Sequence, residues 1–398
     1  MNPATPGNIA SGTAAFVALL AVAVVVAVFA RRLRVPAAVA FVAVGLFFPP
    51  FGPIAVPFAF GATLLFVYLP PLIFEGSWNV DIGALRRTAV AVAMLAVPGV
   101  IVTTLVVAGG VAAAKLLPLV AAFMLGAVVS ATDPVAVIAI FRSLRIPVDL
   151  QTIVEGESIA NDGIALVLYG LGLEFAAGPA GVAYAGAALH AVVAVAGGIA
   201  LGIIAAVVIG FAIRFAEDRA TELAGTVVLA YASFGAATAL GLSGVFATAA
   251  AAVTFRARSR EALTAQGVEE VDRFWEAIAF IANALVFLST GLVIQLPRIL
   301  HEPALVIVAL VCVFASRAIL SYVMLPLAGV GKRHAAWRTV TFLSGMRGAL
   351  SLALALGLPA TFPYRAQIID ATFAIVFVTL VVQGALVERV LVRLPLRR

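Results

Sequence analysis

Residues 155–163, EGESIANDG, carry oxygen-bearing side chains at spacings that suit a bound cation. In a helix Glu157 lies one turn from Asn161, and Ser158 lies one turn from Asp162, so each pair shares a face. Carboxylate and hydroxyl oxygens are hard ligands, which favour Na⁺, K⁺ or Li⁺ over soft metals. This segment therefore predicts a site for an alkali cation.

Residues 130–134, SATDP, predict an interrupted helix that could contribute to such a site. A proline inside a helix removes a backbone hydrogen bond, and Ser130 and Thr132 can bond the groups that Pro134 frees. Asp133 directly precedes the proline. A discontinuous membrane helix leaves backbone carbonyl groups exposed to a cation, so an acidic side chain at the break favours ion binding.

Residues 344–351, SGMRGALS, place Arg347 between two glycines and predict a second interrupted helix. Counted along the predicted membrane-spanning helices, it comes seven spans after the first. An odd separation gives the two interrupted spans opposite directions in the membrane, as an inverted repeat requires. We expect repeat one at about 9–175, a linking helix at about 184–213 and repeat two at about 221–388.

The composition shows what kind of elements must position these residues. Of 398 residues, 64% are hydrophobic and 11% are charged, against about 25% charged in soluble domains. The mean hydropathy is +1.17. These values exclude a soluble enzyme and a disordered chain, and they predict an all-α polytopic membrane protein in which most of the chain lies in lipid. The single cysteine, Cys312, lies in an apolar run, so no disulfide framework is expected.

Apolar stretches of helix length predict thirteen membrane spans, which form one transmembrane domain across 1–398 without a soluble regulatory domain. Two of them are short for a span of about 20 residues, and the seventh is long and tilted. The spans are expected at 9–30, 35–48, 58–75, 87–109, 117–141, 151–175, 184–213, 221–239, 242–255, 272–295, 303–327, 337–358 and 366–388.

The basic residues test this count and set an orientation. If the N-terminus lies outside, twenty of the 25 Lys and Arg residues lie in loops on the inner side. The outer loops hold three, which are Lys115, Arg298 and Arg365. This asymmetry predicts a multi-pass protein of the cell membrane with its C-terminus in the cytoplasm. It also explains the net charge of +6 without a nucleic-acid partner.

Charged residues inside the spans are functional candidates, because a charge at mid-membrane costs several kcal/mol. At about 1.5 Å per residue, six of them lie near the middle of the membrane. Glu155 lies closer to the inner surface and is interpreted as solvated. The six are Glu75, Asp133, Glu157, Asp162, Arg317 and Arg347.

The motifs and their order resemble the monovalent cation/proton antiporter-1 family, which includes bacterial NhaP-type sodium/proton antiporters and animal sodium/proton exchangers. The one departure is Ile159-Ala160, where the family usually has larger residues, and it affects no ligand. The matching segments are LPPLIFEG at 69–76, SATDPVAV at 130–137, GESIANDG at 156–163, SRA at 316–318 and GMRGA at 345–349.

The resemblance implies thirteen helices in two inverted six-helix repeats, with unwound helices five and twelve crossing each other. It also implies a homodimer and alternating access. Asp162 would be the essential ion-binding carboxylate, completed by Asp133, Ser158 and the backbone carbonyl of Thr132. Glu75 would contribute through water.

The resemblance also implies supporting roles for four residues. Asn161 would support the site without titrating. Glu157 and Arg317 would form an ion pair between spans six and eleven. Arg347 would balance charge at the crossing.

The expected function is a secondary antiporter that exchanges H⁺ for Na⁺, or for Li⁺ or K⁺, without a resident cofactor. Because Asn161 cannot take up a proton and Arg317 holds Glu157 ionised, one-for-one electroneutral exchange is expected. A potassium-selective antiporter and a cation channel are the alternatives. An intramembrane protease could use Asp133 with Asp162, but the flanking sequence lacks a Gly-x-Gly-Asp element. A sodium-coupled symporter lacks an evident organic pocket, and ATP-driven transport lacks a nucleotide motif.

Overall fold

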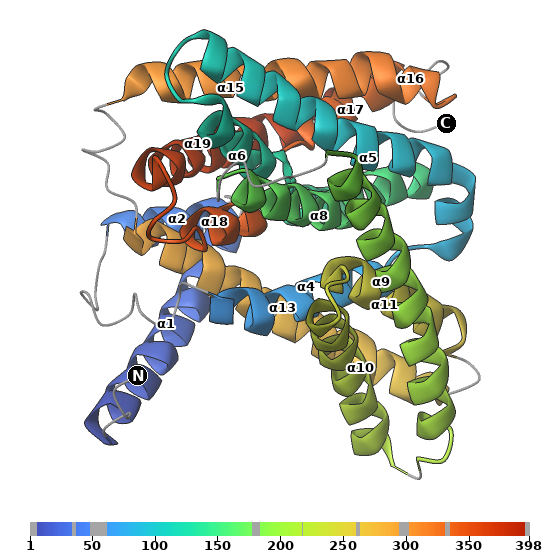
Figure 1. Ribbon diagram of the computed structural model, residues 1–398. Coiled ribbons are helices and arrows are strands. Elements are labelled where there is room, and N and C mark those ends of the chain that lie inside the picture. Colours follow the sequence, from blue (N-terminus) through green and yellow to red (C-terminus); the bar gives the residue numbers. More distant parts are fainter. Residues whose placement is uncertain are drawn as a thin grey trace.

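The computed structural model describes residues 6–33, 37–47, 62–176, 184–216, 218–259, 263–293, 302–330 and 335–394. Within these ranges the regular structure is entirely helical, which confirms the predicted all-α class (Figure 1). Residues 35–36, 48, 58–61 and 294–295 of the expected spans, and Arg298 of the outer loops, lie outside the described residues.

One helix, or a run of consecutive helical segments, overlaps each of the thirteen expected spans. Ten spans are single α-helices, and the eleventh is α15 (Pro303–Ile319), a π-helical turn (Leu320–Met324) and α16 (Leu325–Leu327). The others are α1 (Pro6–Leu33), α2 (Ala37–Phe47), α4 (Ala62–Trp78), α5 (Ile82–Ala113), α8 (Val148–Ala176), α9 (Tyr184–Ile213), α10 (Arg219–Ala239), α11 (Gly244–Ala257), α13 (Ala265–Val293) and α19 (Arg365–Arg393).

The two spans with predicted interruptions are each divided into two helices. The fifth consists of α6 (Leu119–Ser130) and α7 (Val135–Leu144), and the twelfth of α17 (Ala335–Leu343) and α18 (Ala349–Leu356). Both interruptions are therefore confirmed.

Six helices of the described chain are long and apolar enough to cross a membrane, which makes this a multi-pass membrane protein. They are at Ile82–Ala113, Val148–Ala176, Leu189–Ile213, Arg219–Ala239, Pro303–Leu327 and Arg365–Arg393. The thirteen-span count and the inverted repeat are consistent with this arrangement and stay predictions.

Several helices begin at a residue whose side chain accepts a free backbone N–H of the first turn. Asp81 accepts from the Ala84 amide at 2.6 Å before α5, and Asp218 accepts from the Thr221 amide at 2.8 Å before α10. The side-chain and backbone hydrogen bonds from Thr221 lower the pKa of the exposed Asp218 carboxyl. These caps fix where the chain turns from loop to helix.

The helices pack as two groups. In Figure 1, α5, α6, α8, α15 and α19 lie together in the upper part, whereas α9, α10 and α11 form a separate bundle at lower right. One buried apolar cluster joins α5, α6, α8 and α15, and another joins α4, α9, α10, α11 and α13. Helix α4 contacts α8 of the upper group and α10 and α11 of the lower bundle, so it lies where the two groups meet. Helix α13 packs against α4 and α10, and α2 packs against α13 and α19.

Small residues allow the closest helix contacts. A Cβ at Gly202 of α9 would collide with the Ala247 carbonyl oxygen of α11, and α9 and α11 pack along much of their length. Likewise, Gly45 of α2 and Gly291 of α13 approach each other's backbone. Such contacts suit membrane helices, which associate mainly through close packing.

Candidate functional site

The two interrupted helices meet at their breaks. The Asp133 amide donates to the Met346 carbonyl at 2.8 Å, so the two unwound segments are joined backbone to backbone. Ser351 donates through its hydroxyl to the Ala131 carbonyl at 3.4 Å. These bonds satisfy polar groups that the breaks would otherwise leave buried and unpaired.

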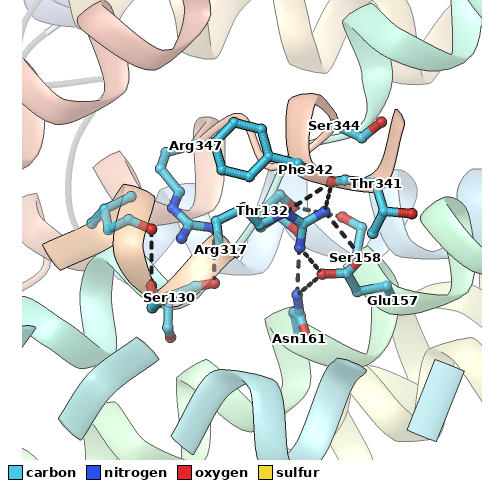
Figure 2. Close-up of polar contacts among 12 residues, drawn as sticks. Ser130, Thr132, Glu157, Ser158, Asn161, Arg317, Thr341, Phe342, Ser344 and Arg347 are labelled. Carbon is cyan, nitrogen blue, oxygen red and sulfur yellow. Dashed lines mark hydrogen bonds and ion pairs between the residues drawn. The ribbon is translucent and has the colours of Figure 1, made fainter. Parts of the chain in front are cut away.

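Charged side chains bind the helix ends that the two breaks create within the membrane. The Arg347 guanidinium donates to the Ser130 carbonyl at 3.3 Å, at the C-terminal end of α6 (Figure 2). The Ala349 amide at the start of α18 donates to Asp133 Oδ2 at 3.4 Å. A cation at a helix C-terminus and an anion at an N-terminus both complement the helix dipole. Gly348 is required here, because a Cβ would collide with the Asp133 carboxylate.

Helix α8 supplies the hydroxyl and amide groups beside the first break. Ser158 Oγ donates to the Thr132 carbonyl at 2.5 Å, and Asn161 Nδ2 donates to Thr132 Oγ1 at 3.2 Å. Because Ser158 donates its only hydroxyl proton to Thr132, its oxygen lone pairs remain able to accept a cation. Asp162 Oδ1, one turn further along α8, is buried and has no hydrogen-bond partner.

The four predicted ligands line one cavity of about 360 Å³. Thr132, Asp133, Ser158 and Asp162 lie on its wall, and so does Glu75 of α4. Glu75 accepts a hydrogen bond from Asn79 Nδ2 at 2.8 Å. The structure therefore brings together all five residues for which the sequence suggested a role in ion binding.

Glu157 and Arg317 lie apart from this cavity lining and form a buried ion pair. Arg317 Nη1 contacts Glu157 Oε1, and Nη2 donates to Glu157 Oε2 at 3.2 Å. Arg317 also donates to the Thr341 carbonyl from Nε at 2.9 Å (Figure 2). Arg317 thus links α15 to α8 and to the last turn of α17.

Asn161 connects the ion pair to the first break, since its Nδ2 also lies 3.4 Å from Glu157 Oε1. Gly345 leaves space for the Arg317 side chain, with which a Cβ would collide. The supporting residues therefore hold α8 against both unwound segments.

The structure corrects the interpretation of Glu155. The sequence suggested a solvated side chain near the inner surface, but Glu155 is 7% exposed and accepts from Gln151 Nε2 at 3.0 Å. It also lines the cavity. Position along the helix gave its depth, whereas burial depends on which face of α8 it occupies.

Two polar residues of α13, Glu276 and Asn283, also line the cavity and were missed by the sequence analysis. Their spacing of seven residues places both on one helix face. That periodicity was available in the sequence, but the packing partner of this face was not.

The comparisons with known proteins agree with this geometry. The family described as "Sodium/hydrogen exchanger, transmembrane" matches residues 17–393. The Na⁺/H⁺ antiporter ApNhaP of Aphanothece halophytica is 32% identical over 341 residues, which span 84% of this chain and 65% of that protein. The Na⁺/H⁺ antiporter NhaH of Halobacillus aidingensis is 30% identical over 397 residues, which span 95% of this chain and 96% of that protein.

The fold has a counterpart among solved structures. That of the sodium proton antiporter MjNhaP1 from Methanocaldococcus jannaschii at pH 8 matches with a TM-score of 0.79 and 20% identity, across 98% of this chain and 100% of that one. Together with the sequence match over nearly the whole chain, this establishes that the protein belongs to the transmembrane sodium/hydrogen exchanger family.

Proposed function

We propose that this protein is a secondary antiporter that exchanges H⁺ for Na⁺ across the membrane. The observation that carries the proposal is the unpartnered Asp162 oxygen, which lies in a cavity beside the Ser158 hydroxyl and the Thr132 carbonyl. A carboxylate, a hydroxyl and a carbonyl are the ligands expected for a hard alkali cation. The relatives named Na⁺/H⁺ antiporters support the same assignment.

One carboxylate serves both substrates in this mechanism. When Asp162 is ionised, it binds Na⁺ together with Asp133, Ser158 and the Thr132 carbonyl, while Glu75 contributes through water. When Asp162 takes up a proton, it loses the charge that holds the cation. Proton and cation therefore compete, and each is carried only in the absence of the other.

The position of the cavity between two sets of helices supports alternating access. Its wall is formed by the break before α7, by α7, α8 and α18 on one side, and by α2, α4 and α13 on the other. A relative movement of these two sets would expose Asp162 first to one side of the membrane and then to the other. We propose a homodimer in the cell membrane, with the N-terminus outside and the C-terminus in the cytoplasm.

The exchange is electroneutral in this proposal. Asn161 cannot titrate, and Glu157 is paired with Arg317 outside the cavity. In this proposal Asp162 changes protonation during the cycle, whereas the other acidic residues that line the cavity keep one state. One proton is therefore exchanged for one monovalent cation.

The test uses proteoliposomes that contain a pH-sensitive dye, to which NaCl, LiCl or KCl is added in turn. We expect proton movement coupled to Na⁺, and the other salts determine whether Li⁺ or K⁺ is also carried. Asp162→Asn should abolish exchange because it removes the titrating charge. Asp149→Asn is the matched control on α8, since Asp149 is a partly exposed acid that pairs with Arg87 at 2.6 Å.

Exchange that persists in a correctly folded Asp162→Asn protein would reject this site. Cation flux without proton movement in the wild-type protein would instead indicate a channel. Coupling to K⁺ alone would replace Na⁺ by K⁺ as the substrate and leave the mechanism intact.

A further inference from the structure

The cavity contains more negative charge than the proposed ion site uses. Five of its lining residues are acidic and none is basic, all within the described part of the chain. Glu75, Asp133 and Asp162 belong to the proposed site. Glu155 of α8 and Glu276 of α13 have no role in it.

Glu276 lies at one end of the cavity. Trp78 Nε1 donates to Asp272 Oδ1 at 2.5 Å, which places the last turn of α4 beside the first half of α13. At this end Asn79 and Glu276 are exposed, whereas Phe287, three turns further along α13, is fully buried. The cavity therefore has its mouth at the end that carries Asn79 and Glu276.

Glu155 lies between this mouth and the proposed ion site. Glu155, Ser158 and Asp162 follow one face of α8, at spacings of three and seven residues, and all three line the cavity. Seven residues of helix place the backbones of Glu155 and Asp162 about 10 Å apart. A dehydrated cation held by Asp162 is thus beyond direct contact with Glu155, although their charges still interact.

We propose that Glu155 and Glu276 form a capture pair, which attracts the hydrated cation into the mouth and sets its apparent affinity from that side of the membrane. The proposal rests on the antiport function above and adds two specificity-determining residues to it. Charges of one sign in a cleft with low-dielectric walls concentrate the field and raise the local concentration of counter-ions. Under the proposed orientation, the mouth faces the cytoplasm.

The experiment compares Glu155→Gln, Glu276→Gln and the double variant with the wild-type protein. Glutamine removes the charge of Glu155 but retains its size and an acceptor for Gln151. Glu269→Gln is the matched control, because Glu269 is an exposed acid of α13 that pairs with Arg273 at 2.5 Å and does not line the cavity. Everted and right-side-out vesicles present opposite faces to added Na⁺, and an alkaline pH minimises competition by protons.

In everted vesicles at low ionic strength, we expect each single variant to raise the KM for Na⁺ about three-fold and the double variant about ten-fold. The kcat should change less than about two-fold, because the ligands of the bound ion are intact. The increase should fade in about 0.5 M choline chloride, where the Debye length falls to about 4 Å. In right-side-out vesicles the KM should stay at the wild-type value.

Equal increases in the KM for Na⁺ on both faces, or the same increase in Glu269→Gln, would overturn the proposal. Either result would mean that the removed carboxylate charges affect Na⁺ binding through a long-range field and not through the mouth of the cavity. A fall in kcat at constant KM would also overturn it, since it would place Glu155 in the transport step. Glu276 is exposed, so its variant decides the matter if Glu155→Gln does not fold. Wild-type exchange with unchanged KM in both variants rejects only the capture pair, whereas absent wild-type exchange rejects the antiport function.

Discussion

At the scale of single residues, the charged side chains proposed to bind the cation lie apart from those that form a structural ion pair. Glu157 and Arg317 are both about 1% exposed and lie outside the cavity lining, whereas Asp133 and Asp162 are half-buried on the cavity wall. The ion pair is fully desolvated, so each partner depends on the other. Removing either one would strand a buried charge.

We therefore expect Arg317→Ala and Glu157→Ala each to destabilise the protein by about 3–5 kcal/mol. The double variant should lose less than the sum of the two, because neither charge is then left alone. Thermal unfolding in detergent measures this. Arg273→Ala is the control and should lie within about 0.5 kcal/mol of the wild type, since its pair with Glu269 is exposed. Strict additivity of the two single effects would argue against the pairing.

Residue types made much of the site predictable. Carboxylates and hydroxyls within apolar spans are rare, and their family motif indicated Asp162, Asp133, Ser158 and Thr132. Glu155 was misread because a sequence position gives depth along a helix but not the neighbours of each face. Glu276 was missed for the same reason.

At the scale of elements, interruptions were predictable and helix partners were not. Pro134 and the glycines around Arg347 indicated both breaks, because these residue types weaken helices locally. By contrast, nothing in the sequence of α9 identified α11 as its neighbour. The contact of Gly202 with the Ala247 carbonyl emerges only from the packed structure.

Gly202→Ala should consequently destabilise the protein by about 1–3 kcal/mol, because the added methyl group forces α9 away from α11. Gly109→Ala on α5 is the matched control, since a Cβ there meets no atom within 4 Å. It should be neutral or stabilise the helix by up to about 1 kcal/mol. Melting temperatures of the two variants in the same detergent provide the comparison. Equal melting temperatures would mean that α9 and α11 pack less closely than described.

At the scale of the whole molecule, composition and the distribution of basic residues predicted a multi-pass chain, and the fold agrees. The cavity could not be located from sequence, because it depends on how α4 and α13 meet α8. The positions of the acidic side chains in this cavity determine which of them take part in exchange. In the proposed cycle, the change of access that carries one cation across the membrane occurs with the cation bound at Asp162. The return change occurs with a proton bound there, so the same charge moves in each direction.

A membrane potential should then leave the exchange equilibrium unchanged, since it acts on net charge at about 2.3 kcal/mol per charge per 100 mV. Valinomycin and a K⁺ gradient set the potential across Na⁺-loaded proteoliposomes, and the pH gradient at which net Na⁺ flux reverses is measured. Liposomes with Asp162→Asn report the passive leak. A reversal point that moves with voltage would imply a second proton site, with Asp133 as the first residue to examine.

The crossing of the half-helices also has a consequence for biosynthesis. Asp133 and its partner Ala349 are 216 residues apart in the chain, so the second is synthesised long after the first. At about 5–20 residues per second, the ribosome needs about 10–40 s to reach it. Throughout that interval the Asp133 amide and the Ser130 and Ala131 carbonyls of the first break lack their partners within the membrane. The nascent chain must shelter them with water, lipid headgroups or a chaperone of the insertion machinery until the second break arrives.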